Sequence, residues 1–113
     1  MKIKCMLDNI EYNSKPKGTE IGKIQNRLEV SQKEISVEEL AYKLSSGCTF
    51  KPALLNGRKT SDWLQQQVFA LDFDENTTIE EQLNLCQSLN MLPSFGYTSF
   101  NHTDYKHKFR LVF

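Results

Sequence analysis

The alternation of apolar and polar residues along the chain predicts strands at four places. They are residues 1–7, 63–73, 95–100 and 108–113, where apolar residues alternate with polar ones or form short runs. Residues 49–55 are also strand-like, but Pro52 interrupts them, so we expect an edge segment there. Residues 9–18 are rich in turn-forming residues and predict a loop, and Asn56-Gly57 predicts a tight turn.

Two helices carry recognisable start signals. Ser36 and Thr78 are each followed three residues later by a glutamate, which is the pattern of a capping box. After Ser36, apolar residues recur at helical spacing until Gly47. The helix after Thr78 is expected to continue through Asn90, with Pro93 closing it. Its expected inner face consists of Ile79, Leu83, Cys86 and Leu89 or Asn90.

These elements together predict the fold class. A third, shorter helix is expected at residues 19–28. The order strand, helix, strand, strand at the C-terminal end predicts an α+β fold, with two or three helices packed on a mainly antiparallel sheet.

Composition indicates a globular chain. Of the 113 residues, 39% are hydrophobic and 11% aromatic, and the formal net charge is zero, which favours one soluble domain over residues 1–113. No apolar run is long enough to span a membrane and no secretory signal is visible, so we expect a cytoplasmic protein without a membrane partner. The odd, widely spaced Cys5, Cys48 and Cys86 indicate reduced thiols.

The segment 68–75 carries the main candidate chemistry. It is expected to be a buried strand that ends in Asp72 and Asp74. Side chains two apart on a strand share a face, so the two carboxylates would repel each other unless a cation lay between them. Mg²⁺ and Mn²⁺ prefer such oxygen ligands. The alternative is a strand that runs out into an acidic surface turn.

The charged residues are segregated along the C-terminal half. Residues 72–81 contain five acids and no Lys or Arg, whereas Lys106, His107, Lys108 and Arg110 follow without an acid. An acidic site beside a basic strand would suit a phosphate bound through a metal, with His102 or Arg110 gripping its oxygens. The alternative is that these charges are ordinary solvated faces of a plain α+β domain.

Several segments, taken in order, resemble a known family. They are residues 47–53, 56–58, 69–74, 97–103 and 108–113. Together they resemble the N-terminal half of a primase-polymerase domain of the archaeo-eukaryotic primase superfamily, in the form that plasmids, phages and integrated elements carry as replication proteins. The resemblance covers roughly residues 44–113. Asp72 and Asp74 match the first motif, Ser99 and His102 the second, and the basic strand of Lys108 to Arg110 is also typical.

The resemblance implies a function in DNA replication, namely metal-dependent nucleotidyl transfer with Mg²⁺ or Mn²⁺. It implies that Asp72 and Asp74 bind the metal and act in catalysis with His102. The nucleotide-binding residues that it implies are Ser99, Lys108, Arg110 and Arg58. The implied partners are a DNA template and nucleoside triphosphates, together with a replicative helicase or a host nucleoprotein complex.

The chain also departs from the family pattern. The family has a further acid downstream of the histidine, and no candidate acid remains beyond the basic strand that ends at Phe113. The spacing from Ser99 to His102 is one residue longer than usual. We therefore expect a partial domain that is not catalytically complete by itself. The alternative is a stand-alone phage or mobile-element protein with a degenerate primase-like fold, whose acidic run at 72–81 binds or inhibits a nucleic-acid-processing partner.

Overall fold

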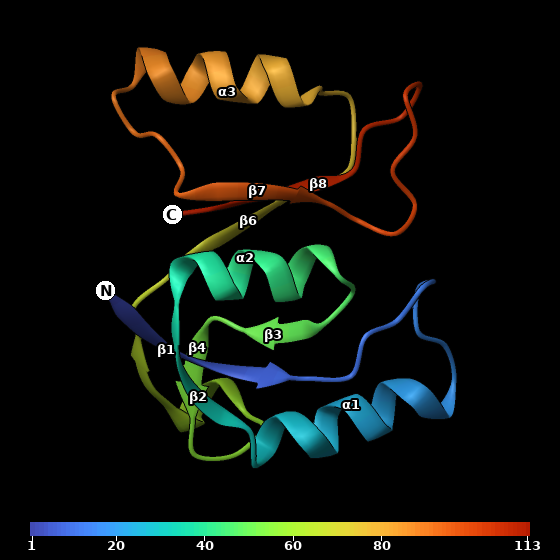
Figure 1. Ribbon diagram of the computed structural model, residues 1–113, viewed down its shortest axis with the longest axis vertical. Helices are drawn as coiled ribbons and strands as arrows, with labels where there is room; N and C mark the ends of the chain where they lie inside the picture. Colours follow the sequence, from blue (N-terminus) through green and yellow to red (C-terminus); the bar gives the residue numbers. More distant parts are fainter. The chain divides into compact units, whose positions relative to one another are not determined.

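The computed structural model describes residues 1–113 and confirms the α+β class (Figure 1). Three α-helices accompany eight short strands, and every strand pairing is antiparallel. The strands form three small sheets rather than one. The chain divides into two compact units, Met1–Phe69 (unit 1) and Ala70–Phe113 (unit 2), and each is described by itself below.

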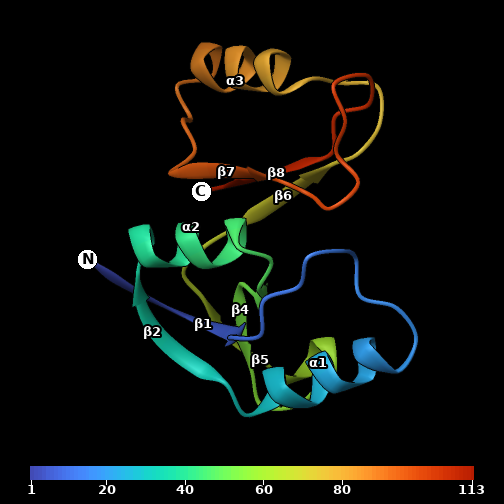
Figure 2. The same ribbon diagram turned by 45° about the vertical axis from the view of Figure 1, so that its right-hand side comes forward.

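Unit 1 is built around its first strand. A three-stranded sheet has the order β2-β1-β3, with β1 (Lys2–Asp8) in the centre, β2 (Gln32–Ser36) and β3 (Thr49–Lys51). The helices α1 (Thr19–Glu29) and α2 (Val37–Ser45) lie on opposite sides of this sheet (Figures 1 and 2). The strand at the N-terminus, the loop after it and both helices confirm the predictions. The strand β2 was not predicted, because Ile35 is its only apolar residue.

The core of unit 1 explains why β1 is apolar on both faces. Met6 packs with Ile24 and Leu28 of α1 and with Leu54, whereas Cys5 and Leu7 point to the opposite face by strand alternation and are also buried. Helix α2 buries Leu40 and Leu44, as its apolar spacing predicts. Ser36 caps it by accepting a hydrogen bond from the Glu39 amide at 3.1 Å.

Gly47 is required where the chain leaves α2. It has φ +97°, and a β-carbon at this position would collide with the backbone carbonyl of Tyr12. Only glycine suits both conditions.

The prediction of one strand at residues 63–73 is wrong. The structure has two strands, β5 (Trp63–Gln66) and β6 (Ala70–Phe73), in different sheets. Between β5 and β6, two glutamine side chains make hydrogen bonds to the backbone in place of strand pairing. The side-chain Nε2 of Gln66 donates to the Val68 carbonyl at 2.9 Å, and the side-chain oxygen of Gln67 accepts from the backbone amide of Lys4 at 2.8 Å. The apolar run in the sequence continues past the end of β5, but the strand does not.

The hairpin that contains β5 also differs from the prediction. Its partner is β4 (Ala53–Leu55), which Pro52 separates from β3. Asn56-Gly57 does not form a two-residue turn. It opens a wider loop over residues 56–62, which includes a 3-10 turn at Thr60–Asp62 and is closed by a hydrogen bond from the Asn56 amide to the Asp62 carbonyl at 2.8 Å.

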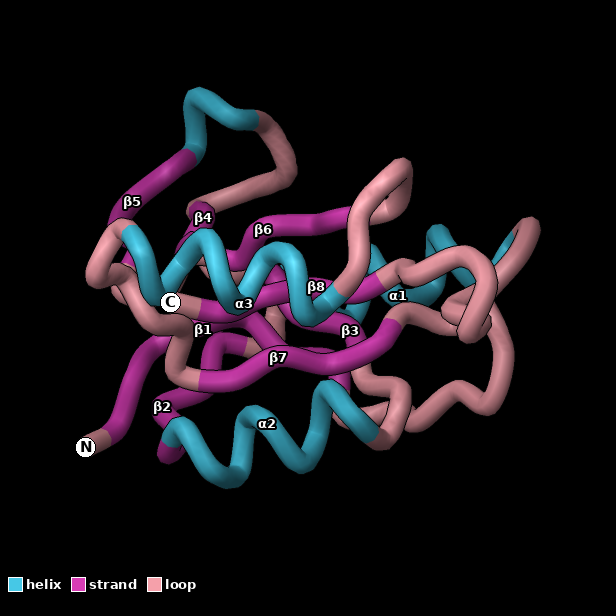
Figure 3. Tube along the Cα trace, turned by 90° about the horizontal axis from the view of Figure 1, so that it is seen from above, coloured by secondary structure: helices cyan, strands magenta, loops and turns pink.

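Unit 2 contains a second three-stranded sheet with the order β6-β8-β7, formed by β6, β7 (Phe95–Thr98) and β8 (Phe109–Val112). Helix α3 (Ile79–Ser88) lies over one face of it (Figures 1 and 3). In this sheet the rings of Phe73 and Phe109 stack with centroids 5.1 Å apart. The edge of Phe109 meets the ring of His107, whose Nδ1 accepts a hydrogen bond from the Ile79 amide at the start of α3.

Helix α3 begins as predicted, but its inner face and its end do not follow the prediction. Thr78 caps it by accepting from the Glu81 amide at 3.1 Å. None of its residues is buried, and Leu83 and Leu89 are 39% and 61% exposed. The helix ends at Ser88 because Asn90 adopts the left-handed conformation, with φ 55°, so Pro93 does not end it. None of the three helices is long and apolar enough to cross a membrane.

Candidate functional site

Three polar residues form a row across the sheet of unit 2. Arg110 on the central strand β8 lies directly opposite Asp72 on β6 and Tyr97 on β7. Residues paired in this way across antiparallel strands point to the same face. Arg110 alternates with Phe109 along β8, so the two side chains point to opposite faces of the sheet. We call Asp72, Arg110 and Tyr97 the polar row.

The side chains of the polar row contact one another through Arg110. Its Nε lies 3.4 Å from Asp72 Oδ1, and one of its terminal nitrogens donates to the Tyr97 hydroxyl at 3.2 Å. Burial raises the pKa of Tyr97, and the nearby guanidinium only partly opposes this. Burial lowers the pKa of Arg110, but Tyr97 and Asp72 more than offset this and raise it. Arg110 therefore stays a cation shared between two partners.

The two aspartates lie near each other in sequence at an exposed strand end. Asp72 belongs to β6, and Asp74 is the first residue after it. Both are exposed, and Leu71 is 51% exposed, so the prediction of a buried strand leading to the pair is wrong. The physical reason is that β6 is an edge strand of a small sheet. Continued alternation would place Asp74 on the same face as Asp72.

The donor set fits a hard divalent cation only in part. No three or more His, Cys, Asp or Glu side chains are grouped so that they could hold a metal ion. Two carboxylates are nevertheless the usual protein contribution to a Mg²⁺ that also binds substrate phosphates and water. Asp72 and Asp74 could supply that contribution.

The loop after β7 brings Ser99, His102 and Lys108 together. The Ser99 amide donates to the Lys108 carbonyl at 2.8 Å, and the Lys108 amide donates to His102 Nδ1 at 3.0 Å. His102 is therefore a half-buried part of an ordered loop rather than a freely solvated side chain. Because Nδ1 accepts a hydrogen bond, the neutral ring carries its proton on Nε2.

His107 is a structural residue of this loop that the sequence did not single out. Its Nδ1 accepts a hydrogen bond from the Ile79 amide at 3.1 Å and so caps the first turn of α3. Its ring lies 4.8 Å from that of His102 and meets the edge of Phe109 at 6.5 Å. Nothing in the basic run around residue 107 indicates that its histidine reaches a helix, because the contact spans 28 residues.

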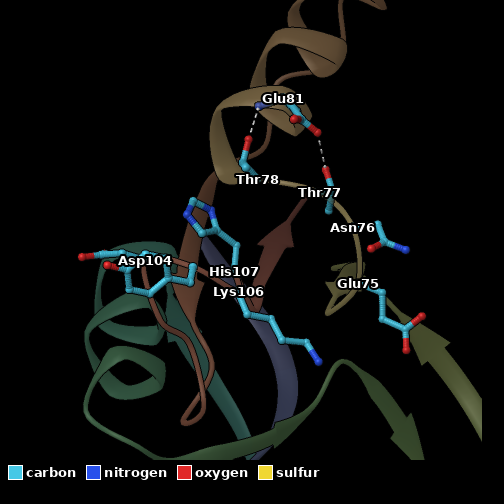
Figure 4. Close-up of a pocket in the computed structure, with 9 residues that line it drawn as sticks. Glu75, Asn76, Thr77, Thr78, Glu81, Asp104, Lys106 and His107 are labelled. Atoms are coloured by element: carbon cyan, nitrogen blue, oxygen red, sulfur yellow. Dashed lines mark hydrogen bonds between the residues drawn. The ribbon is translucent and has the colours of Figure 1, made fainter.

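A pocket of about 500 Å³ opens beside the start of α3 (Figure 4). Residues 75–78 and Glu81 line one side and residues 104–107 the other. None of the predicted site residues lines it. Its acids are Glu75, Glu81 and Asp104, against the single base Lys106. This charge balance disfavours a triphosphate.

Arg58 lies in unit 1, whereas the other predicted site residues all lie in unit 2. Its guanidinium is hydrogen-bonded to Asn26 and paired with Glu29, both of α1. The charge is thus already neutralised, and a role of Arg58 in phosphate binding stays a prediction.

Unit 1 contains a second set of the same three residue types, also unpredicted. Arg27 binds both carboxylate oxygens of Asp8, at 2.8 and 2.9 Å, and donates to the Tyr12 hydroxyl at 2.9 Å. Asp8 is only 2% exposed. The hydrogen bonds to Asp8 and Tyr12 raise the pKa of Arg27. This set, in which the Asp8 carboxylate is buried, joins α1 to the end of β1.

No family model, no curated protein and no solved structure matches the chain.

Proposed function

We propose that unit 2 binds a nucleoside triphosphate together with Mg²⁺ or Mn²⁺, as the nucleotide-binding part of a primase-polymerase that acts in DNA replication. The observation that carries the proposal is the polar row with its neighbours. The edge strand β6 contains Asp72 and is followed directly by Asp74, and the strand beside it supplies Arg110 directly opposite Asp72. The loop between β7 and β8 supplies His102, whose ring lies beside that of His107.

The acids and bases have distinct roles in this proposal. Asp72 and Asp74 are the metal-binding pair, and a bound divalent cation would neutralise phosphate charge during nucleotidyl transfer. Arg110 presents a planar fork that matches two phosphate oxygens. His102 offers the Nε2 proton to a phosphate oxygen, because its Nδ1 is held by the Lys108 amide. Ser99 and Lys108 are the further nucleotide-binding residues.

The wider setting belongs to the same proposal. A DNA template would be the second substrate, and the reaction would take place in the cytoplasm. A replicative helicase or a host nucleoprotein complex is the proposed macromolecular partner.

The proposal predicts nucleotide binding that depends on a divalent metal. We expect the chain to bind a fluorescent nucleoside triphosphate in the presence of Mn²⁺ and not in its absence. The double substitution Asp72→Ala, Asp74→Ala should weaken this binding at least about tenfold, because two of the metal's charged ligands are lost. Fluorescence anisotropy would measure it, and circular dichroism would verify that the variant is folded.

A charge-matched control separates the site from general electrostatics. Glu20 and Glu38 are exposed acids in the first turns of α1 and α2. The variant Glu20→Ala, Glu38→Ala removes the same charge from unit 1 and should leave binding within about twofold. Equal affinity in the parent and in the Asp72, Asp74 variant would contradict the proposed function.

A second candidate function is supported by the exposure of the acidic run. All five acids at residues 72–81 are exposed: Asp72, Asp74, Glu75, Glu80 and Glu81. The chain would then be a binding protein of a phage or mobile element that covers a basic groove of a nucleic-acid-processing partner. This function predicts binding to an oligoarginine peptide that is independent of divalent metal. Substitution of Glu75, Glu80 and Glu81 by Gln should weaken it as much as loss of the aspartates does.

A further inference from the structure

The loop over residues 56–62 contains the only asparagine of the chain that is followed by a glycine. It joins β4 to β5, and Asn56 at its start is exposed. Its backbone is held by hydrogen bonds from the Asn56 N–H to the Asp62 carbonyl at 2.8 Å and from the Lys59 N–H to the Asp62 carboxylate at 2.9 Å. Neither the side-chain amide of Asn56 nor the backbone N–H of Gly57 makes a hydrogen bond.

These two unbonded groups are the reactants of an intramolecular deamidation. The electrophile is the side-chain carbonyl carbon of Asn56, and the nucleophile is the backbone nitrogen of Gly57. Glycine hinders this attack less than any other residue, because it has no β-carbon and its backbone is the most permissive. The two groups belong to neighbouring residues, so the ring closes without a ligand or partner.

We propose that Asn56 is a site of spontaneous covalent modification, at which the backbone nitrogen of Gly57 closes on the Asn56 side chain and converts it to aspartate or isoaspartate. The Gly57 nitrogen loses its proton to hydroxide and forms a bond to Asn56 Cγ. The bond from Cγ to Nδ2 breaks, and Nδ2 takes a proton from water and leaves as ammonia. Water then opens the succinimide ring at either carbonyl. Nothing is oxidised or reduced, and the step does not depend on the proposed function.

The isoaspartate product should loosen the hairpin of β4 and β5. In this product the main chain runs through the former side chain of Asn56 and is one methylene longer. The added methylene lies between the Asn56 N–H, which closes the loop on Asp62, and Arg58, which pairs with Glu29 of α1. A two-stranded hairpin has little stability of its own to absorb this change. The aspartate product keeps the original backbone and adds only a charge.

Ageing of the 113-residue chain at neutral and mildly alkaline pH, followed by tryptic peptide mapping, tests the modification. The peptide that ends at Arg58 contains Asn56 as its only asparagine. We expect the mass shift of an amide-to-acid exchange to accumulate there at least about tenfold faster than at Asn13, which is also exposed but is followed by Ser14. The rate should rise with pH, because the attacking nitrogen must lose its proton.

Two variants identify the reacting group and its consequence. In Asn56→Gln the side chain is longer and a five-membered ring cannot form, so the mass shift should be lost from this peptide. Asn56→Asp adds the charge without lengthening the backbone. Hydrogen exchange of β4 and β5 should be at least about threefold faster in the isoaspartate form than in the fresh parent, and Asn56→Asp should resemble the parent. Gly57→Ala is unsuitable, because its β-carbon would collide with the Asp62 carboxylate.

Ageing of the same chain in urea separates the folded loop from the bare sequence. Because the fold holds neither reactant, the folded chain should react within about fivefold of the unfolded chain. Stronger protection would show that the native loop prevents the attack and would overturn the proposal. Equal rates at Asn56 and Asn13, or a mass shift that persists in Asn56→Gln, would overturn it as well. Unchanged hydrogen exchange in the isoaspartate form would refute the loosening of the hairpin. The rate comparisons use the parent chain alone, so they hold even if a variant fails to fold.

Discussion

At the scale of single residues, burial decides what an aspartate can do. Asp8 is only 2% exposed, so its charge must be satisfied inside the protein, and Arg27 does this with two hydrogen bonds. Asp72 is exposed and has only one long contact with Arg110. The same pair of residue types therefore forms a buried ion pair in unit 1 and an exposed one in unit 2.

The first prediction compares the two arginines. Arg27→Gln leaves the Asp8 carboxylate buried without its partner, whereas Arg110→Gln leaves Asp72 in contact with water. We expect the first substitution to lower the free energy of unfolding at least about three times as much as the second. Urea titrations followed by circular dichroism would measure this, with the fluorescence of Trp63, the only tryptophan, reporting on unit 1. Equal losses would contradict the contrast between the two sets.

The second prediction concerns pH and the buried thiol of Cys5. Burial raises the pKa of this thiol from 9.0 to about 11. The folded state thus disfavours the thiolate, so stability is fully present below pH 9 and is lost as the pH rises toward 11. The contribution is about 2–3 kcal/mol at most.

The variant Cys5→Ala provides the control for this prediction. It should be less stable than the parent at pH 7.5, because it leaves a cavity in the core. Its stability, followed by Trp63 fluorescence, should nevertheless fall less steeply between pH 9 and 11. Parallel pH profiles of parent and variant would show that Cys5 does not contribute to the loss.

At the scale of elements, local signals predicted the helices better than apolar runs predicted the strands. The N-caps Ser36 and Thr78 are correct because capping depends on residues within one turn. The strand at 63–73 is wrong because its break depends on a contact with Lys4, more than sixty residues away. Similarly, Leu83 and Leu89 have helical spacing, but spacing cannot show whether a sheet offers enough surface to bury them.

The candidate site shows the same limit. The aspartate pair and the basic strand could be found from sequence, because each lies within a few residues. That Arg110 pairs with Asp72 could not, since it depends on the register between β6 and β8. Tyr97 and His107 were missed for this reason, as their partners are 13 and 28 residues away.

The third prediction compares the two caps. Ser36→Ala and Thr78→Ala should each cost about 1 kcal/mol of helix stability. Helix α2 is also anchored by two buried leucines, whereas α3 has no buried residue. Hydrogen exchange followed by mass spectrometry should therefore show much faster exchange across α3 in Thr78→Ala, with only the first turn of α2 affected in Ser36→Ala. A similar change in both helices would contradict the assignment of α3 as the weakly anchored one.

At the scale of the whole molecule, a net charge of zero conceals opposite charges on the two units. Unit 1 contains eleven bases and eight acids, whereas unit 2 contains three bases and six acids. A negative unit repels a nucleic acid backbone, and a divalent cation at Asp72 and Asp74 would reduce that repulsion. If a DNA template binds this chain, the excess bases of unit 1 are the natural contact for its phosphates.

The fourth prediction follows from this distribution. An excess of about three bases in unit 1 should give single-stranded DNA binding a shallow salt dependence, with a slope of log affinity against log salt of about −2. Lys15, Lys17 and Lys23 are exposed bases around the start of α1, and their replacement by Gln should abolish most of that slope. The matched removal of the three acids Glu75, Glu80 and Glu81 from unit 2 should instead strengthen binding. Fluorescence anisotropy at several salt concentrations would measure this slope. A steep slope that the unit 1 lysines do not change would contradict the prediction. It would place the DNA contact on the basic strand of unit 2, where the triphosphate is proposed to bind.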